Sequence, residues 1–170
     1  VVMCVALLGA TGPLAGCPKN TGPVVDVATL ETDPKANFDD GIRILQTPDR
    51  KTGAIDYQTA YLRFAKSVEL GGPPKAAFNA AWVAEVLGNP SDAEIFYTKA
   101  FQADPTYTAA MFSLARLYNQ TGKGAMAVDL YKGYLASNPD DLEVRNDLIV
   151  SLTAAKRYDE ALVEGQNILM

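Results

Sequence analysis

The chain has 170 residues, of which 48% are apolar, and this is enough for one modest domain with a buried core. Its net charge of −5 argues against a nucleic-acid-binding protein, which needs a basic face to neutralise phosphates. The sequence contains no histidine, and its two cysteines, Cys4 and Cys17, lie near the N-terminus. The commonest general base and metal ligand are therefore missing, which argues against catalysis and metal binding.

An apolar run from Val1 to Leu8 opens the chain and is too short to span a bilayer as a helix. Small residues follow it, which is typical of the core and cleavage region of a secretory signal. Leu14-Ala15-Gly16-Cys17 then resembles the lipobox of bacterial lipoproteins. The resemblance implies a signal peptide over residues 1–16 and lipidation of Cys17, which would anchor the protein to a membrane. The alternative is a buried apolar segment of a cytoplasmic protein.

Residues 17–34 contain Pro18, Gly22, Pro23 and several threonines, without helical periodicity. We therefore expect a flexible tether, which at ~3.3 Å per residue reaches at most about 50 Å. In many lipoproteins of Gram-negative bacteria an Asp after the lipidated cysteine retains the protein in the inner membrane. Pro18 stands at that position here, so the resemblance implies the outer membrane, facing the periplasm. The chain does not begin with Met, so we expect the natural protein to begin earlier.

From residue 74 onward the sequence repeats with a period of about 34 residues. Four residues recur at this spacing: Gly88, Ala93, Tyr97 and Pro105, followed by Gly122, Ala127, Tyr131 and Pro139. Small residues suit the crossing of two closely packed helices, and a proline after Asp or Asn ends a helix. Two segments also resemble helix capping boxes, Ser91-Asp92-Ala93-Glu94 and Asp140-Asp141-Leu142-Glu143.

This pattern resembles the tetratricopeptide repeat (TPR), whose units are pairs of antiparallel helices. The resemblance implies an all-α fold over residues 35–170, in which helix-turn-helix units stack into a right-handed α-solenoid. The clear units are residues 74–107, 108–141 and an incomplete 142–170, and residues 35–73 are interpreted as a divergent first repeat. Because the sequence ends within a second helix and without a polar cap, we expect the natural protein to continue.

In the TPR family the first helices of the units line a concave groove. Residues that face away from the second helix are expected to point into it: Phe78, Trp82 and Glu85, then Phe112, Arg116 and Asn119, then Asn146 and Val150. Of these we take Phe78, Trp82, Phe112, Arg116, Asn119 and Asn146 as the candidate partner-binding residues, because aromatic, amide and guanidinium groups suit a peptide. For Trp82, packing against the preceding repeat is an equal alternative, and for Phe78 and Phe112 core packing is the favoured one. The family's carboxylate clamp lacks its lysines here, so we do not expect it.

The sequence shows no catalytic constellation. Acidic pairs such as Asp39-Asp40 and Asp159-Glu160 lie at predicted helix starts, where carboxylates interact favourably with the helix dipole. Gly122-Lys123-Gly124 is interpreted as a turn because it lacks the remaining residues of a nucleotide-binding loop. We therefore expect no enzymatic activity, no cofactor and no metal.

Together these features predict an envelope-anchored scaffold that binds a protein or peptide partner in assembling a motility, pilus or secretion complex. In general character the chain is similar to TPR lipoproteins of trans-envelope complexes in gliding bacteria. One alternative is an accessory subunit or chaperone of a cell-wall enzyme. If the lipobox is not used, the alternative is a cytoplasmic TPR adaptor.

Overall fold

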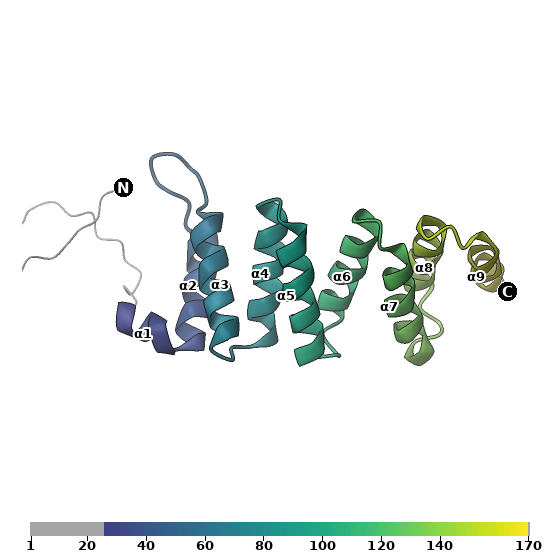
Figure 1. Cartoon of the computed structure of the whole chain (residues 1–170), viewed down its shortest axis with the longest axis horizontal. Coiled ribbons are helices and arrows are strands. Elements are labelled where there is room, and N and C mark those ends of the chain that lie inside the picture. The colour runs from purple at the N-terminus through teal and green to yellow at the C-terminus, as the bar shows by residue number, and fades with distance from the viewer. Residues whose placement is uncertain (1–25, 170) are drawn as a thin grey trace, which may run out of the picture.

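The structure, a computed structural model, describes residues 26–169, and within this range the chain is all-α, without strands (Figure 1). The predicted fold class is confirmed. The predicted signal peptide of residues 1–16, Cys17 and the first part of the tether lie outside the described residues. The helices of the described part are α1 (Val27–Thr32), α2 (Pro34–Gln46), α3 (Tyr57–Glu69), α4 (Pro74–Val86), α5 (Pro90–Ala103), α6 (Thr108–Gln120), α7 (Gly124–Ser137), α8 (Leu142–Ala154) and α9 (Tyr158–Leu169).

Each helix packs against its neighbours in the chain, so the helices form one elongated row with α1 and α9 at opposite ends (Figure 1). The last three pairs, α4 with α5, α6 with α7 and α8 with α9, start at Pro74, Thr108 and Leu142. These starts follow the period of the sequence repeat. A short connection forces two successive helices to run antiparallel, and stacking such pairs buries a continuous core.

The end of the predicted tether departs from the expected extended chain, because it contains α1. Leu30 of this helix is only 6% exposed. The Asn37 side chain in α2 donates a hydrogen bond from Nδ2 to the Leu30 carbonyl at 2.5 Å. A six-residue helix is not stable alone, so this packing on α2 accounts for it. Periodicity could not reveal the helix, because it is too short to show a pattern.

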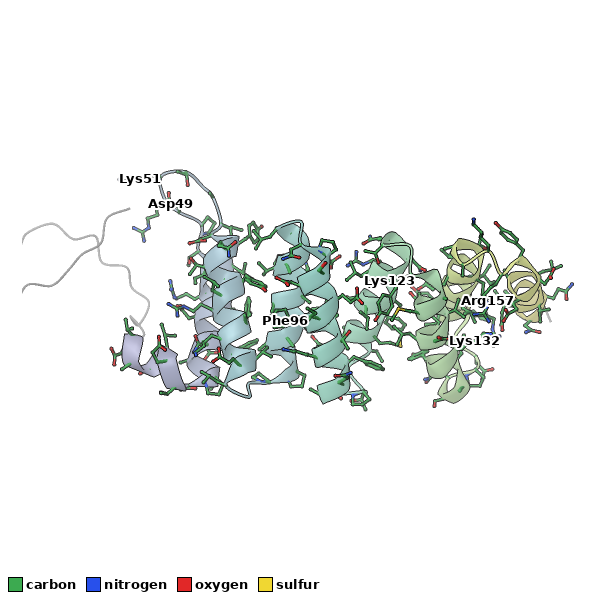
Figure 2. All side chains as sticks on the ribbon, in the orientation of Figure 1. Asp49, Lys51, Phe96, Lys123, Lys132 and Arg157 are labelled. Atoms are coloured by element: carbon green, nitrogen blue, oxygen red, sulfur yellow. The ribbon has the colours of Figure 1, made fainter. Side chains whose placement is uncertain are left out.

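A loop over residues 47–56 joins α2 to α3 and is longer than the three-residue connections in the other pairs. Asp49 organises it, since one of its carboxylate oxygens accepts hydrogen bonds from the backbone amides of Lys51 (2.9 Å) and Thr52 (2.8 Å). These hydrogen bonds hold the pKa of Asp49 below its ordinary value. Figure 2 shows Asp49 and Lys51 on this loop, at one end of the row and away from the later helix pairs.

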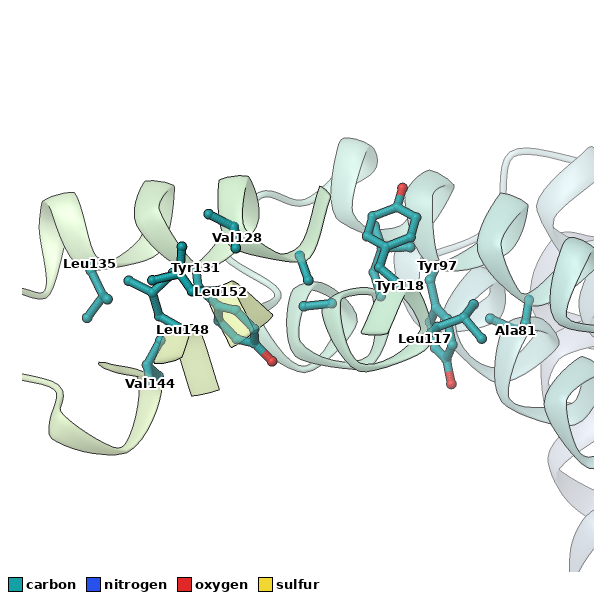
Figure 3. Packing of buried hydrophobic residues seen from close by; sticks show 14 of the residues in the cluster. Ala81, Tyr97, Leu117, Tyr118, Val128, Tyr131, Leu135, Val144, Leu148 and Leu152 are labelled. Carbon is teal, nitrogen blue, oxygen red and sulfur yellow. The ribbon is translucent and has the colours of Figure 1, made fainter. Parts of the chain in front are cut away.

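The core consists of small residues where helices cross and large ones beside them. Ala81, Ala93, Ala115 and Ala127 are fully buried and allow the helix backbones to approach closely. Larger side chains fill the space between successive units (Figure 3): Tyr97, Tyr118, Val128, Tyr131, Leu148 and Leu152. Full burial of an aliphatic side chain such as Leu148 contributes about 2 kcal/mol. The alanines and tyrosines that define the repeat pattern in the sequence are thus the residues that pack the units together.

Helix starts differ in detail from the predicted capping boxes. Pro90 is the first residue of α5, and the cap is Asn89, whose side chain accepts a hydrogen bond from the Asp92 amide at 3.2 Å. The prediction that placed a cap at Ser91 is therefore wrong. At α8 the cap is Asp141, which accepts from the Val144 amide at 3.1 Å, so the predicted box that began at Asp140 is displaced by one residue.

Candidate partner-binding groove

The first helices α6 and α8 border an open pocket of about 420 Å³, whose floor is completed by α7. On α6, residues three and four apart share one helix face, which is why five lining residues come from this helix. We call this pocket the α6–α8 groove. Its lining residues are Phe112, Ser113, Arg116, Asn119, Gln120, Tyr131, Asp147 and Val150.

One side of the groove is aromatic. Phe112 packs against Tyr131, with ring centroids 6.3 Å apart, and against Tyr134 at 5.3 Å. Burial and the negative charge of Asp147 raise the pKa of Tyr131 to about 12, so its hydroxyl stays protonated at neutral pH. Val150 lies on α8 and is 60% exposed, so it offers apolar surface to a ligand without being part of the core.

Arg116 is held by a carboxylate from the preceding unit. Its Nη2 donates to both carboxylate oxygens of Glu85 on α4, at 2.7 and 3.0 Å. The Tyr97 hydroxyl donates to the same carboxylate at 2.7 Å. Hydrogen bonding to Glu85 raises the pKa of Arg116, and burial together with the Glu85 contact raises the pKa of Tyr97. The positive charge of Arg116 is therefore paired with Glu85, although the Arg116 side chain stays 49% exposed.

Asn119 connects the two bordering helices. Its Nδ2 donates to the Ser151 hydroxyl at 2.9 Å, and that hydroxyl donates to the Asp147 carbonyl at 2.8 Å. Because the Ser151 proton is used in this way, its oxygen must accept from Asn119, and this fixes the orientation of the Asn119 amide. Asn119 Oδ1 is buried and has no hydrogen-bond partner among the described residues.

Asp147 is the carboxylate of the groove. Within residues 26–169 it has no ion pair, although Arg116 lines the same pocket. Asp147 is exposed, but its partial desolvation in the groove raises its pKa above the ordinary value, and the negative charges of Glu143 and Asp141 raise it further. The groove thus holds one paired cation and one unpaired anion.

The structure brings together part of the predicted set. Phe112, Arg116 and Asn119 line the groove, and so does Val150. Glu85 acts at its edge, where it holds Arg116.

The other predicted residues lie elsewhere. Phe78 packs between Tyr97 and Tyr107, with ring centroids 5.5 and 5.2 Å away. Trp82 is 41% exposed and packs edge-on against Tyr57 of α3, the arrangement given as its alternative. Asn146 is exposed on α8 and does not line the groove. Asn146 is the repeat equivalent of Phe112. The aromatic contacts of Phe112 are with Tyr131 and Tyr134 on α7, the second helix of its own unit.

Sequence reasoning missed four lining residues: Ser113, Gln120, Tyr131 and Asp147. Asp147 occupies the position in its unit that Ser113 occupies in the preceding one, just as Asn146 corresponds to Phe112. A groove face drawn one residue wider along each first helix would have included both Ser113 and Asp147. The sequence did not indicate that Tyr131 lines the groove, because Tyr131 belongs to a second helix and its place in the repeat pattern predicts a core residue.

The described part of the chain offers neither a metal cluster nor a membrane-spanning helix. No three His, Cys, Asp or Glu side chains in residues 26–169 are grouped so that they could hold a metal ion. None of the described helices is both long and apolar enough to traverse a bilayer.

Comparison with known proteins gives local sequence matches. A segment of 46 residues, 27% of the chain, is 48% identical to cellulose synthase operon protein C of Komagataeibacter xylinus. A segment of 58 residues, 34% of the chain, is 40% identical to the protein of that name from Komagataeibacter sucrofermentans. In each case the match spans 4% of the relative's length. The chain matches no protein-family model.

The comparison with solved structures addresses the fold. The crystal structure of MamA protein superposes with a TM-score of 0.63, over 79% of this chain and 70% of that chain. Sequence identity is 14%, so the similarity shows a shared helical-repeat fold and nothing finer.

Proposed function

We propose that this chain, which has a TPR-type repeat fold, is a scaffold whose α6–α8 groove binds a segment of a partner protein. The observation that carries the proposal is the meeting of Phe112, Arg116 and Asn119, all predicted from the repeat register, in one pocket of about 420 Å³. An open groove with an aromatic wall and a few fixed polar groups suits side chains of a peptide. On this proposal the protein is a binding module and not an enzyme.

We further propose that the scaffold is anchored in a bacterial cell envelope and acts there in assembling a motility, pilus or secretion complex. The lipobox-like Leu14-Ala15-Gly16-Cys17 after an apolar run supports this location. A lipid on Cys17 would hold the protein at the membrane although none of its described helices could span one.

A second candidate function is that of an accessory subunit of an envelope enzyme that makes polysaccharide. The observation that favours it is the local similarity to cellulose synthase operon protein C. The partner decides between the two candidates, because the first requires a fibre or channel component and the second requires an enzyme that makes polysaccharide.

The groove is tested by placing a photo-crosslinking amino acid at Val150 in the full chain, expressed in its native cell. The control position is Val163 on α9, which has a similar exposed fraction, 55% against 60% for Val150. We expect a partner to crosslink at Val150 and not at Val163, with mass spectrometry identifying it. Crosslinks of equal yield at both positions, or at Val163 only, would rule out the groove as the binding site.

The location is tested by intact mass spectrometry of the N-terminal peptide from protein purified from native membranes. A peptide that begins at a lipid-modified Cys17 is the expected result. A peptide that retains unmodified residues before Cys17 would remove the lipid anchor and leave the cytoplasmic adaptor.

A further inference from the structure

The fixed groups of the α6–α8 groove differ in whether they are available to a ligand. Arg116 is paired with Glu85 through two hydrogen bonds of 2.7 and 3.0 Å, and its Nη1 also donates to Gln120 at 3.3 Å. A ligand carboxylate at Nη2 of this guanidinium would compete with Glu85, whose side chain is only 18% exposed. The groove is therefore poorly suited to capture an anion.

Asp147 presents the opposite situation. Its carboxylate lines the groove and has no counter-ion among the described residues. Its charged neighbours are Glu143 and Asp141 on the α8 side, and Arg116 on α6, which is already paired with Glu85. The negative charge at Asp147 is thus not compensated by any residue that the structure describes, and a cation placed beside it gains a favourable interaction.

The rest of the lining suits a long cationic side chain. Phe112 is partly exposed and offers aromatic surface, and a cation near an aromatic ring face is attracted by its quadrupole. Val150 is exposed on the Asp147 helix, and the aliphatic stem of a lysine or arginine can pack on such a surface while its charge stays near water. Asn119 Oδ1 is buried, so this oxygen is not accessible to a ligand and the accessible acceptor of the groove is the Asp147 carboxylate.

We propose that the groove selects a partner segment bearing a lysine or arginine side chain, with its cation at Asp147 and its stem against Phe112 and Val150. This inference rests on the proposed function, because it names the chemistry of the segment that the groove binds. The inference adds two points. Arg116 joins two units through its ion pair with Glu85, and the charge that the groove presents to a ligand is negative.

The test uses the purified full chain and three labelled peptide libraries of equal length. The central residue is lysine, alanine or glutamate, and all other positions vary among uncharged residues. Fluorescence anisotropy should show the lysine library binding about tenfold more tightly than the alanine library, the scale of one charge-assisted contact in a partly exposed site. The glutamate library should bind least tightly, and the lysine preference should weaken as salt is added.

Variants assign the preference to a residue. Asp147→Asn should reduce the affinity of the lysine library to that of the alanine library, and Asp147→Lys should shift the preference to glutamate. Asp129→Asn on α7 is the matched control, because it makes the same change at an exposed carboxylate outside the groove. A lysine preference that survives Asp147→Asn, or that disappears with Asp129→Asn, would overturn the proposal.

A neutral blocking variant separates this inference from the proposed function. Val150→Trp should reduce binding of all three libraries, and Val163→Trp on α9 should not. Binding that depends on Val150 but is indifferent to the central charge overturns this inference and leaves the groove in place. Binding that ignores Val150→Trp, or no binding of any library, overturns both.

Discussion

At the residue scale, Glu85 determines what Arg116 can do. It accepts hydrogen bonds from the Tyr97 hydroxyl and from Arg116, which belongs to the next unit. Charge-assisted hydrogen bonds from a guanidinium to both oxygens of a carboxylate have a restricted geometry, and here they connect α4 to α6. Since Arg116 is 49% exposed, solvent screening limits the contribution of the pair to about 1 kcal/mol.

Asp147 should reduce the stability of the folded protein at neutral pH. Its pKa is raised in the folded state above the ordinary 3.8, because partial desolvation and the charges of Glu143 and Asp141 disfavour the carboxylate. The associated stabilisation is present below the unfolded-state pKa and is lost as the pH rises through the folded-state pKa. We therefore expect Asp147→Asn to raise the free energy of unfolding at pH 7 by a few tenths of a kcal/mol after solvent screening, and to raise it less near pH 3.

Urea unfolding of both proteins at the two pH values measures this difference. Asp129→Asn, which makes the same change at an exposed carboxylate outside the groove, serves as the control. A loss of stability in Asp147→Asn at pH 7 would show that this carboxylate stabilises the fold, contrary to the expected sign.

At the element scale, the first helices α4, α6 and α8 all end in the same way. Gly88, Gly122 and Lys156 occupy equivalent positions in successive units, and all have positive φ, at 74°, 77° and 59°. The amide that follows each of them bonds back to a carbonyl near the end of the helix, at 2.8, 2.7 and 2.8 Å. Glycine adopts this left-handed conformation without steric cost, whereas a lysine does not.

Lys156→Gly should therefore stabilise the protein. The substitution removes the steric cost of a side chain at positive φ, and we expect a gain of about 1 kcal/mol in the free energy of unfolding. Thermal or urea unfolding measures it.

Gly122→Ala, the reverse change at the equivalent position, should destabilise by a similar amount. A Cβ at Gly122 meets no atom within 4 Å, so any loss reports the backbone conformation and not a clash. A destabilised Lys156→Gly would show that the lysine side chain itself contributes to the end of α8.

At the scale of the whole molecule, the chain is a linear stack in which each unit is stabilised by its neighbours. Two cations, Lys132 of α7 and Arg157 before α9, both contact Glu160, and Figure 2 shows them near one another. These contacts hold the pKa of Glu160 down at about 2. The outer face of α9 has no further helix of the described chain upon it, and Leu162 there is 65% exposed.

The position in the stack should decide the cost of a mutation. Leu162 is the repeat equivalent of Val128, which is fully buried between α7 and α8. We expect Val128→Ala to cost about 2 kcal/mol of unfolding free energy, because it opens a cavity in the core. Leu162→Ala should cost less than about 0.5 kcal/mol, because its side chain is largely in water.

Both values come from urea unfolding of the 170-residue chain, so each variant is the control for the other. Equal losses would mean that the outer face of α9 is covered in solution by something that the described residues do not include.

The sequence by itself determined the helix pairs and the register of the stack. Both follow from short-range or periodic features: alanines at the crossings, glycine or a substitute at the helix ends, and a constant spacing from unit to unit. The same register placed Phe112, Arg116 and Asn119 on one face, because residues three and four apart on a helix share a side. It could not show α1, whose six residues are held by contact with α2.

Only the tertiary structure decided which side chains are available in the groove. The pairing of Arg116 with Glu85 joins two units, and Trp82 lies against Tyr57 of another helix. The choice of Asp147 over Asn146 depends on how α8 is rotated about its axis when it packs on α7, and one residue on a helix corresponds to a turn of about 100°. Packing between units sets the rotation of α8 and brings charges that are distant in the sequence together. The spacing of residues along the chain encodes neither of these two effects.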